Sequence, residues 1–212
     1  MSALLAPDYT ASALVIIDFQ NDCVLPGAPM EVAGSFEVLS TLAALAQAFR
    51  TAGRPMVHVV RGYLSDGSNA DLCRREAIAG GKRLLVPETA SADFPEALKP
   101  AGAPPLDWPA LLTGSVQSLG PHDQVMHKPR WGAFYQTPLE AWLCAHGIST
   151  LVFAGCNFPN CPRTSIYEAS ERDFRLVLAR DAMSGLYERG LDELRNIGVV
   201  LSDSAGIAGK LN

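Results

Sequence analysis

Residues 13–18 read ALVIID, a run of five apolar residues that ends in a carboxylate. A short, continuous apolar run of this kind suits a strand that is buried on both faces of a sheet. Similar runs recur along the chain, and between them many apolar residues fall three or four positions apart, which is the spacing of a helix face. From these runs we expect strands at 13–18, 55–60, 124–127, 150–154, 175–180 and 199–201.

Alternating strands and helices predict one α/β domain over residues 1–212, with three layers, α/β/α, and a mainly parallel sheet. The expected helices lie near 36–49, capped by Ser35, at 71–82, from Thr137 to about 147, from Pro162 onward and around 191–197. The segment 62–121 is rich in proline and poor in periodic apolar positions. We expect it to be a long excursion over the sheet edge or the mouth of a site, rather than a second domain.

The composition of the 212 residues narrows the class of protein. Hydrophobic residues make up 48% and charged residues 18%, so the chain is expected to fold. The net charge of −5 argues against a nucleic-acid or anionic-membrane partner, and no apolar run approaches the roughly 20 residues that cross a bilayer. The N-terminus does not resemble a signal peptide, and the five cysteines form neither a disulfide framework nor a zinc motif. We therefore expect a cytoplasmic protein.

Three reactive side chains follow three of the expected strands, at the edge of a parallel sheet where ligands bind. Asp18 follows the first strand, Lys128 the third, and Cys161 lies in the turn GCNFPNCPR after the fourth. Because Pro162 favours a helix start there, the helix field and the lysine are expected to ionise the Cys161 thiol. A carboxylate can take the thiol proton and later give it to a leaving amine. The trio predicts acyl transfer through a thioester, which means hydrolysis of a C–N bond.

Three blocks of sequence carry a family resemblance. They are ALVIIDFQNDC (13–23), HKPRWGAFYQTPLEAWL (127–143) and LVFAGCNFPNCPRTSIYEASERDF (151–174). Together and in this order they resemble the isochorismatase-like cysteine hydrolases, which include nicotinamidases, N-carbamoylsarcosine amidohydrolases, and biuret and ureidoacrylate hydrolases. The resemblance covers roughly residues 11–203. It implies a Rossmann-like fold with a six-stranded, mainly parallel sheet, and a homodimer or homotetramer.

The resemblance also implies a catalytic triad and its surroundings. Asp18 would be the general base and acid, Lys128 its charge partner and Cys161 the nucleophile. The Cys156–Asn157 peptide would be cis, and the N–H groups of Asn157 and Cys161 would form the oxyanion hole. The substrate would be a small amide, ureide or carbamoyl compound. No cofactor is expected, and no histidine lies between His58 and His122 to build a nicotinamidase-type metal centre.

Candidate substrate-binding residues come from the neighbourhood of the triad. They are Gln20, Trp131, Phe134, Tyr135 and Arg163. Arg61 and Tyr63, beyond the second strand, are further candidates, and Cys156 is the rival thiol.

Two other functions stay open on the sequence. The chain could be a non-catalytic or differently specialised binding protein of the same family. A nucleotide- or flavin-binding α/β domain is the third possibility, but it needs a Gly-rich phosphate loop after the first strand. The sequence there, DFQNDCVLPG (18–27), has no G-x-G-x-x-G.

Overall fold

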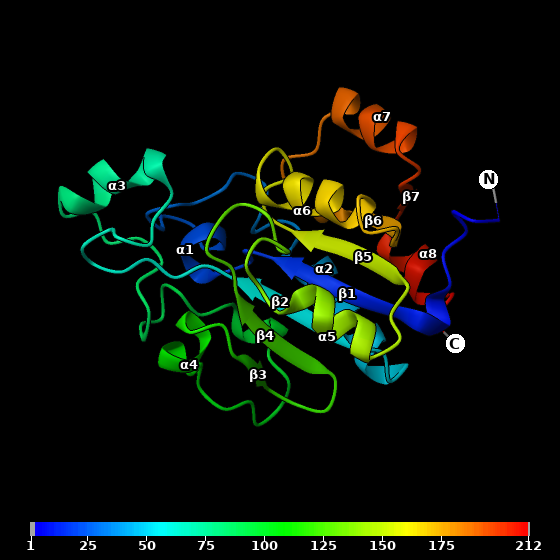
Figure 1. The fold of residues 1–212 in the computed structure, drawn as a ribbon, viewed down its shortest axis with the longest axis horizontal. Coiled ribbons are helices and arrows are strands. Elements are labelled where there is room, and N and C mark those ends of the chain that lie inside the picture. Colours follow the sequence, from blue (N-terminus) through cyan, green and yellow to red (C-terminus); the bar gives the residue numbers. More distant parts are fainter. Residues whose placement is uncertain (1–2, 212) are drawn as a thin grey trace.

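The structure is a computed structural model that describes residues 3–211. Its centre is a seven-stranded sheet in the order β3-β4-β2-β1-β5-β6-β7, in which only β3 is antiparallel to its neighbour (Figure 1). The strands are β1 Ser12–Ile17, β2 Met56–Val60, β3 Val116–Ser118, β4 Asp123–His127, β5 Thr150–Gly155, β6 Arg175–Met183 and β7 Val200–Ser202. The helices are η1 Tyr9–Ala11, α1 Asn21–Val24, α2 Leu39–Thr51, α3 Leu72–Ala79, η2 Glu96–Leu98, α4 Trp108–Leu112, α5 Leu139–Ala145, α6 Cys161–Ser170, α7 Glu188–Asn196 and α8 Ser204–Ala208.

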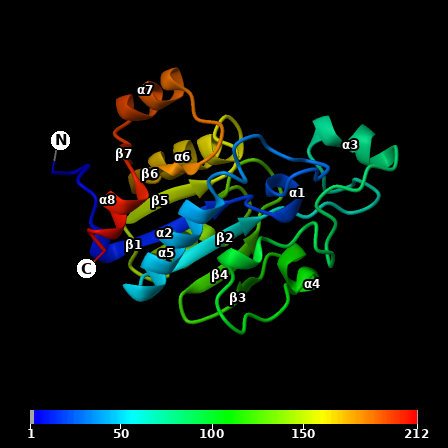
Figure 2. The same ribbon diagram turned by 180° about the vertical axis from the view of Figure 1, so that it is seen from behind.

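Helices cover both faces of the sheet, which confirms the predicted three-layer α/β fold. The helices α5, α6 and α7 lie on the face nearer the viewer in Figure 1, and α2 lies on the face seen in Figure 2. All six residues of β1 are buried, because successive side chains of a strand point to opposite faces and both faces are covered. Leu14 and Ile16 pack toward α2, while Val15 and Ile17 pack toward α5 and α6.

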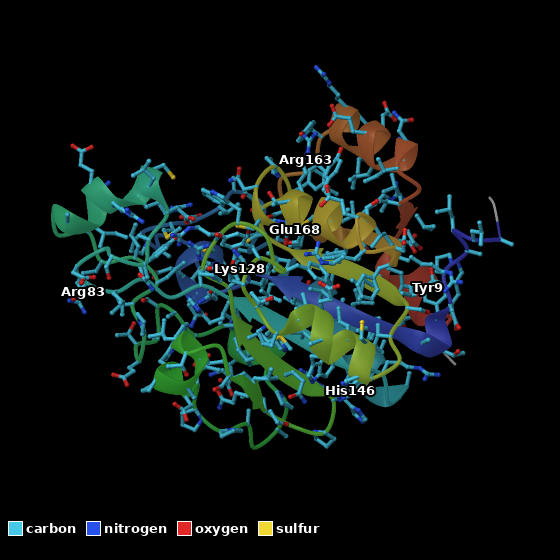
Figure 3. All side chains as sticks on the ribbon, in the orientation of Figure 1. Tyr9, Arg83, Lys128, His146, Arg163 and Glu168 are labelled. Atoms are coloured by element: carbon cyan, nitrogen blue, oxygen red, sulfur yellow. The ribbon has the colours of Figure 1, made fainter. Side chains whose placement is uncertain are left out.

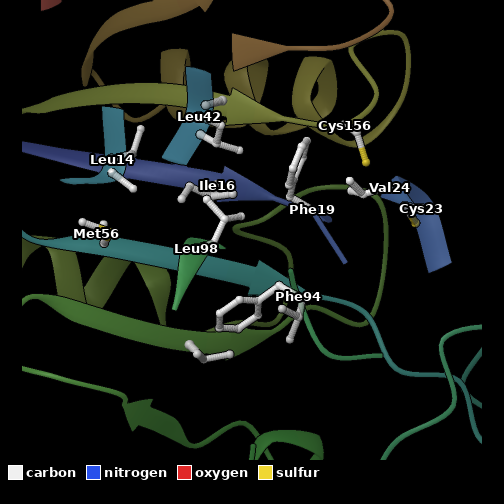
Figure 4. Close-up of a cluster of buried hydrophobic side chains, with 14 of the residues drawn as sticks. Leu14, Ile16, Phe19, Cys23, Val24, Leu42, Met56, Phe94, Leu98 and Cys156 are labelled. Carbon is white, nitrogen blue, oxygen red and sulfur yellow. The ribbon is translucent and has the colours of Figure 1, made fainter. Parts of the chain in front are cut away.

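The segment 62–121 contributes directly to one of these two cores. Figure 4 shows Leu14 and Ile16 of β1 in one cluster with Leu42 of α2, and with Phe94 and Leu98 from this segment. The proline-rich stretch therefore packs on the sheet through a few large anchors. Its helix α3 is set apart from the sheet in both ribbon views (Figures 1 and 2) and buries only Ile78.

Several elements differ from the prediction. The sheet has one strand more than the six that the resemblance implies, because a turn at 119–122 folds β3 back on β4 and Leu119 N–H donates to Asp123 O over 2.9 Å. The proposed cap at Ser35 is wrong: α2 begins at Leu39, and Ser35 Oγ hydrogen-bonds Ser184 Oγ at 2.8 Å instead. The short helices α1, α4 and α8 were not predicted, since each spans no more than about one turn. In the described range, 3–211, no helix is long and apolar enough to cross a membrane.

Candidate active site

The carboxyl ends of β1, β4 and β5 bring the three predicted residues together. Asp18 directly follows β1, and its N–H donates to Val59 O at 3.0 Å. Lys128 directly follows β4, and its N–H donates to Val60 O at 2.9 Å. Cys161 is the first residue of α6, which follows β5 after a short turn. Hydrogen bonds to the sheet therefore fix the backbones that carry the acid and the cation.

Asp18 and Lys128 form a buried ion pair. Lys128 Nζ lies 2.9 Å from Asp18 Oδ2, and it also donates to Arg130 O at 3.1 Å. Figure 3 shows Lys128 in the interior of the molecule, near the carboxyl ends of the strands. The second carboxylate oxygen, Asp18 Oδ1, is buried and has no hydrogen-bond partner within residues 3–211. That oxygen is free to accept a proton from a neighbouring group.

The Cys161 thiol interacts with both members of this pair, but it is not ionised at rest. The side chain is only 7% exposed. Burial, and then the negative charge of Asp18, raise the pKa of Cys161 to about 12, while the positive charge of Lys128 lowers it. The predicted resting thiolate is therefore wrong, because desolvation and the carboxylate together outweigh the ammonium group. The site holds a thiol beside a base.

The turn between β5 and α6 presents two unpaired backbone donors. The Cys156–Asn157 peptide bond is cis. Neither Asn157 N–H nor Cys161 N–H has a hydrogen-bond acceptor in the described part of the chain, and both residues line the cavity in front of the thiol. Gly155 enters this turn with φ +120, and an added Cβ would lie 2.3 Å from Ile17 O, so only glycine fits.

Cys156, the alternative candidate for the nucleophile, has a structural role. Its Sγ donates to the backbone oxygen of Asp18 at 3.0 Å. A hydrogen bond with Cys23, together with burial, raises the pKa of Cys156 well above its usual value. This thiol therefore helps to hold the backbone of Asp18 in place.

A cavity that is partly open to solvent lies in front of Cys161. Its charged and aromatic lining comes from Asp18, Arg61, Tyr63, Asp71, Arg74 and Trp131. Trp131, Arg61 and Tyr63 had been singled out from the sequence. Asp71 and Arg74 had not, because they lie in or next to α3, inside the irregular segment.

Four of the sequence candidates lie outside this cavity. The Gln20 side-chain amide is fully buried and bridges the ends of β1 and β2, donating to Arg61 O at 2.8 Å and accepting from Arg61 N–H at 2.7 Å. The Phe134 ring packs 6.0 Å from Phe174. Tyr135 is 48% exposed and is not part of the cavity wall.

Arg163, the fourth, projects from α6 toward α7 (Figure 3). Its guanidinium group pairs with Glu193 and bonds the Tyr187 hydroxyl. Arg163 thus joins two helices. Of the five residues predicted to bind substrate, the cavity brings only Trp131 near Cys161.

Two histidines are buried in the neighbouring strands. His58 Nε2 lies 3.4 Å from Asp123 Oδ1, and its ring stacks on Phe94. Burial, together with the charges of Arg61 and Lys128, lowers the pKa of His127 to about 4. Over residues 3–211, no three His, Cys, Asp or Glu side chains are grouped as a metal site would require.

Comparison with known proteins gives consistent matches. The sequence profile of the Isochorismatase domain matches residues 12–205 of this chain. A ureidoacrylate amidohydrolase of Methylobacterium radiotolerans is 30% identical, over 84% of this chain and 69% of its own length. A probable inactive nicotinamidase of Arabidopsis thaliana is 25% identical, over 92% of this chain and 93% of its own length. An isochorismatase family protein from Desulfovibrio vulgaris, solved by crystallography, has a TM-score of 0.81 and 30% identity, and the match covers 95% of this chain and 98% of the other. The likeness spans the sheet from β1 to β7.

Proposed function

This chain belongs to the Isochorismatase domain family, and we propose that it is a hydrolase that cleaves a C–N bond of a small amide, ureide or carbamoyl compound through a thioester on Cys161. The amidohydrolase named among its relatives supports the reaction class. The observation that carries the mechanism is the buried pair of Asp18 and Lys128, 2.9 Å apart, in contact with the Cys161 thiol.

In the first half of the reaction, the Cys161 sulfur attacks the substrate carbonyl carbon. Its proton passes to the free Oδ1 of Asp18 as the C–S bond forms. Because the raised pKa favours a neutral resting thiol, we place this transfer together with the attack. The carbonyl oxygen becomes an oxyanion and accepts hydrogen bonds from the N–H groups of Asn157 and Cys161, each such donor being worth about 3 kcal/mol.

The intermediate then collapses, and the C–N bond breaks. The leaving nitrogen takes the proton from Asp18, so ammonia or an amine departs and the acyl group remains on Cys161 as a thioester. Through its ion pair, Lys128 keeps the carboxylate of Asp18 in place beside the sulfur.

In the second half, water attacks the thioester carbonyl. Asp18 accepts a proton from that water, the C–S bond breaks, and the proton returns to the Cys161 sulfur. The acid product leaves with the water oxygen. Each group of the protein is then in its starting state.

The test is an ammonia-release screen over nicotinamide, biuret, ureidoacrylate and N-carbamoyl amino acids, with Cys161→Ala as the blank. We expect wild-type protein to turn over at least one compound and Cys161→Ala to retain its fold without activity. Cys144→Ala is the matched control, because Cys144 is an exposed thiol on α5. Acid quenching followed by intact-protein mass spectrometry should detect the acyl group on Cys161. Undiminished turnover in Cys161→Ala would refute the mechanism.

The same screen tests the alternative that the chain is a binding protein. That alternative is relevant because one relative is described as a probable inactive nicotinamidase. A binding protein would show saturable binding of such a compound with no ammonia released and no acyl group on Cys161.

A further inference from the structure

Two guanidinium groups line the same cavity as Cys161, and the first of them has an unused donor. Arg61 follows β2 and is only 3% exposed. Its Nη2 pairs with the Asp71 carboxylate and lies 3.2 Å from the Tyr63 hydroxyl. Its Nη1 is buried and has no hydrogen-bond partner within residues 3–211. Leaving a buried N–H of a charged group without a hydrogen bond costs desolvation free energy. A ligand acceptor at this atom would remove that cost.

The second group, Arg74, belongs to α3 and is even less satisfied. Its guanidinium carbon lies 5.5 Å from the centre of the Trp131 ring, and Nη1 approaches the Met30 sulfur at 3.9 Å. Its Nε is buried without a partner, and no carboxylate in the described chain lies within ion-pair distance of it. A guanidinium group placed over an aromatic ring is held by the cation–π attraction, which uses none of its N–H donors.

The position of Arg74 depends on the ion pair beside it. Asp71 precedes α3 as its N-cap residue, three positions before Arg74. The pairing of Asp71 with Arg61 therefore ties the start of α3 to the end of β2. One turn of helix later, Arg74 reaches the cavity.

The charged groups of the cavity wall differ in whether they already have a partner. The wall carries two cations, Arg61 and Arg74, and two anions, Asp18 and Asp71. Asp71 pairs with Arg61, and Asp18 pairs with Lys128, which is fully buried and is not part of the lining. Asp18 and Asp71 each already have a partner cation. The remaining positive charge is that of Arg74, at the cavity wall.

We propose that the substrate carries a carboxylate, which Arg74 binds together with the free Nη1 of Arg61, while the amide or ureide at its other end meets Cys161. This inference rests on the proposed hydrolysis and names its substrate class: a short acid with a terminal amide or ureide. The planar fork of arginine matches a carboxylate, and the negative charge of that carboxylate would pair with Arg74. Arg74 selects and orients the substrate and takes no part in bond cleavage.

The experiment uses matched pairs of compounds in which a neutral amide replaces the carboxylate. These are maleamate with maleamide, and N-carbamoylglycine with N-carbamoylglycinamide. We expect kcat/KM for the acid to exceed that for its neutral partner at least tenfold, after allowing for the two equivalent amides of maleamide. Arg74→Gln should reduce this acid-to-neutral ratio at least tenfold, mainly through KM, and Arg74→Lys should restore part of it. Arg75→Gln is the control, because Arg75 is an exposed arginine on the same helix, and within residues 3–211 its side chain hydrogen-bonds only Ala70 O.

A second measurement does not depend on turnover. Calorimetric titration of Cys161→Ala should show tighter binding of maleamate than of maleamide, and Arg74→Gln added to that variant should abolish the difference. Equal ratios in wild type and Arg74→Gln would overturn the inference, since a purely structural arginine would affect both compounds alike. Equal binding of the two compounds would overturn it as well. Ammonia release by Cys161→Ala would instead refute the proposed function.

Discussion

Lys128 Nζ lies 2.9 Å from Asp18 Oδ2, and the lysine side chain is completely shielded from solvent. Each charge is tolerated in the interior only because the other is present. The pair thus links the stability of the molecule to its chemistry, since the same carboxylate is the proposed base for Cys161.

Removing one partner should therefore cost stability as well as turnover. We expect Lys128→Met to lower the free energy of unfolding by about 3–5 kcal/mol at pH 7, because it leaves a buried carboxylate unpaired. Adding Asp18→Asn should recover part of that loss while the protein stays inactive. Urea denaturation of both single variants and the double variant gives the coupling energy. A loss below about 1 kcal/mol for Lys128→Met would show that the pair is more solvated than the structure indicates.

The raised pKa of Cys161 predicts that one substitution increases the reactivity of the thiol while it abolishes turnover. Asp18→Asn removes the negative charge that helps to keep the thiol protonated, so the thiolate fraction should rise. We expect alkylation of Cys161 by iodoacetamide at pH 8 to become about tenfold faster in this variant, although turnover is lost. Peptide mass spectrometry follows each thiol, and the exposed Cys73 and Cys144 serve as internal references. Slower alkylation of Cys161 in Asp18→Asn would contradict the assigned charge effect.

The two buried histidines should make the protein sensitive to mild acid. The folded-state pKa values of His58 and His127 lie below the ordinary 6.5, so the unfolded chain binds protons first as the pH falls. The contribution of the two neutral histidines to the free energy of unfolding is then fully present above pH 6.5 and is lost as the pH falls below it. For His127, with a pKa of about 4, the loss is about 1.4 kcal/mol per pH unit and about 3 kcal/mol by pH 4. Urea denaturation between pH 7.5 and 4.5 measures this slope.

The matched substitutions are His127→Gln, which should make the dependence on pH shallower, and His146→Gln on the exposed end of α5, which should not. Parallel slopes for His127→Gln and the parent protein would rule out His127 as the source.

Gly155 offers a test of the turn that leads to the nucleophile. In Gly155→Ala the new Cβ would lie 2.3 Å from Ile17 O and 2.7 Å from Ile17 N, both backbone atoms of the central strand. We expect a loss of more than about 4 kcal/mol in the free energy of unfolding. Gly81→Ala is the control, because Gly81 also has positive φ, +96, but open space around it, so it should lose only about 1–2 kcal/mol. Similar thermal shifts at the two positions would contradict the close approach of β5 to β1.

The fold and the meeting of Asp18, Lys128 and Cys161 could be predicted because they depend on the sheet. Buried parallel strands place their carboxyl ends at one edge, so residues that directly follow them converge. The ionisation state of Cys161 could not be predicted, since a sequence shows which charges are near but not how far water is excluded.

The substrate-binding candidates were less successful because they relied on closeness in sequence. Arg163 lies two residues after Cys161, and side chains two apart on a helix point in different directions, so it reaches α7 instead of the cavity. Gln20 likewise turns into the interior two residues after Asp18. The sequence analysis did not find Arg74, because its position depends on the ion pair that Asp71 makes with the end of β2. No periodic pattern in the sequence predicts that contact.

The separation of α3 from the sheet has an evolutionary consequence. The groups proposed to break the bond stand on strand ends and on α6, whereas Arg74 stands on an outlying helix that buries one apolar residue. Exchanging residues 62–87 between relatives would then retune which molecule is accepted while leaving the reactive centre untouched. In such a lineage, the range of substrates can change through substitutions in a peripheral segment, without changes in the core.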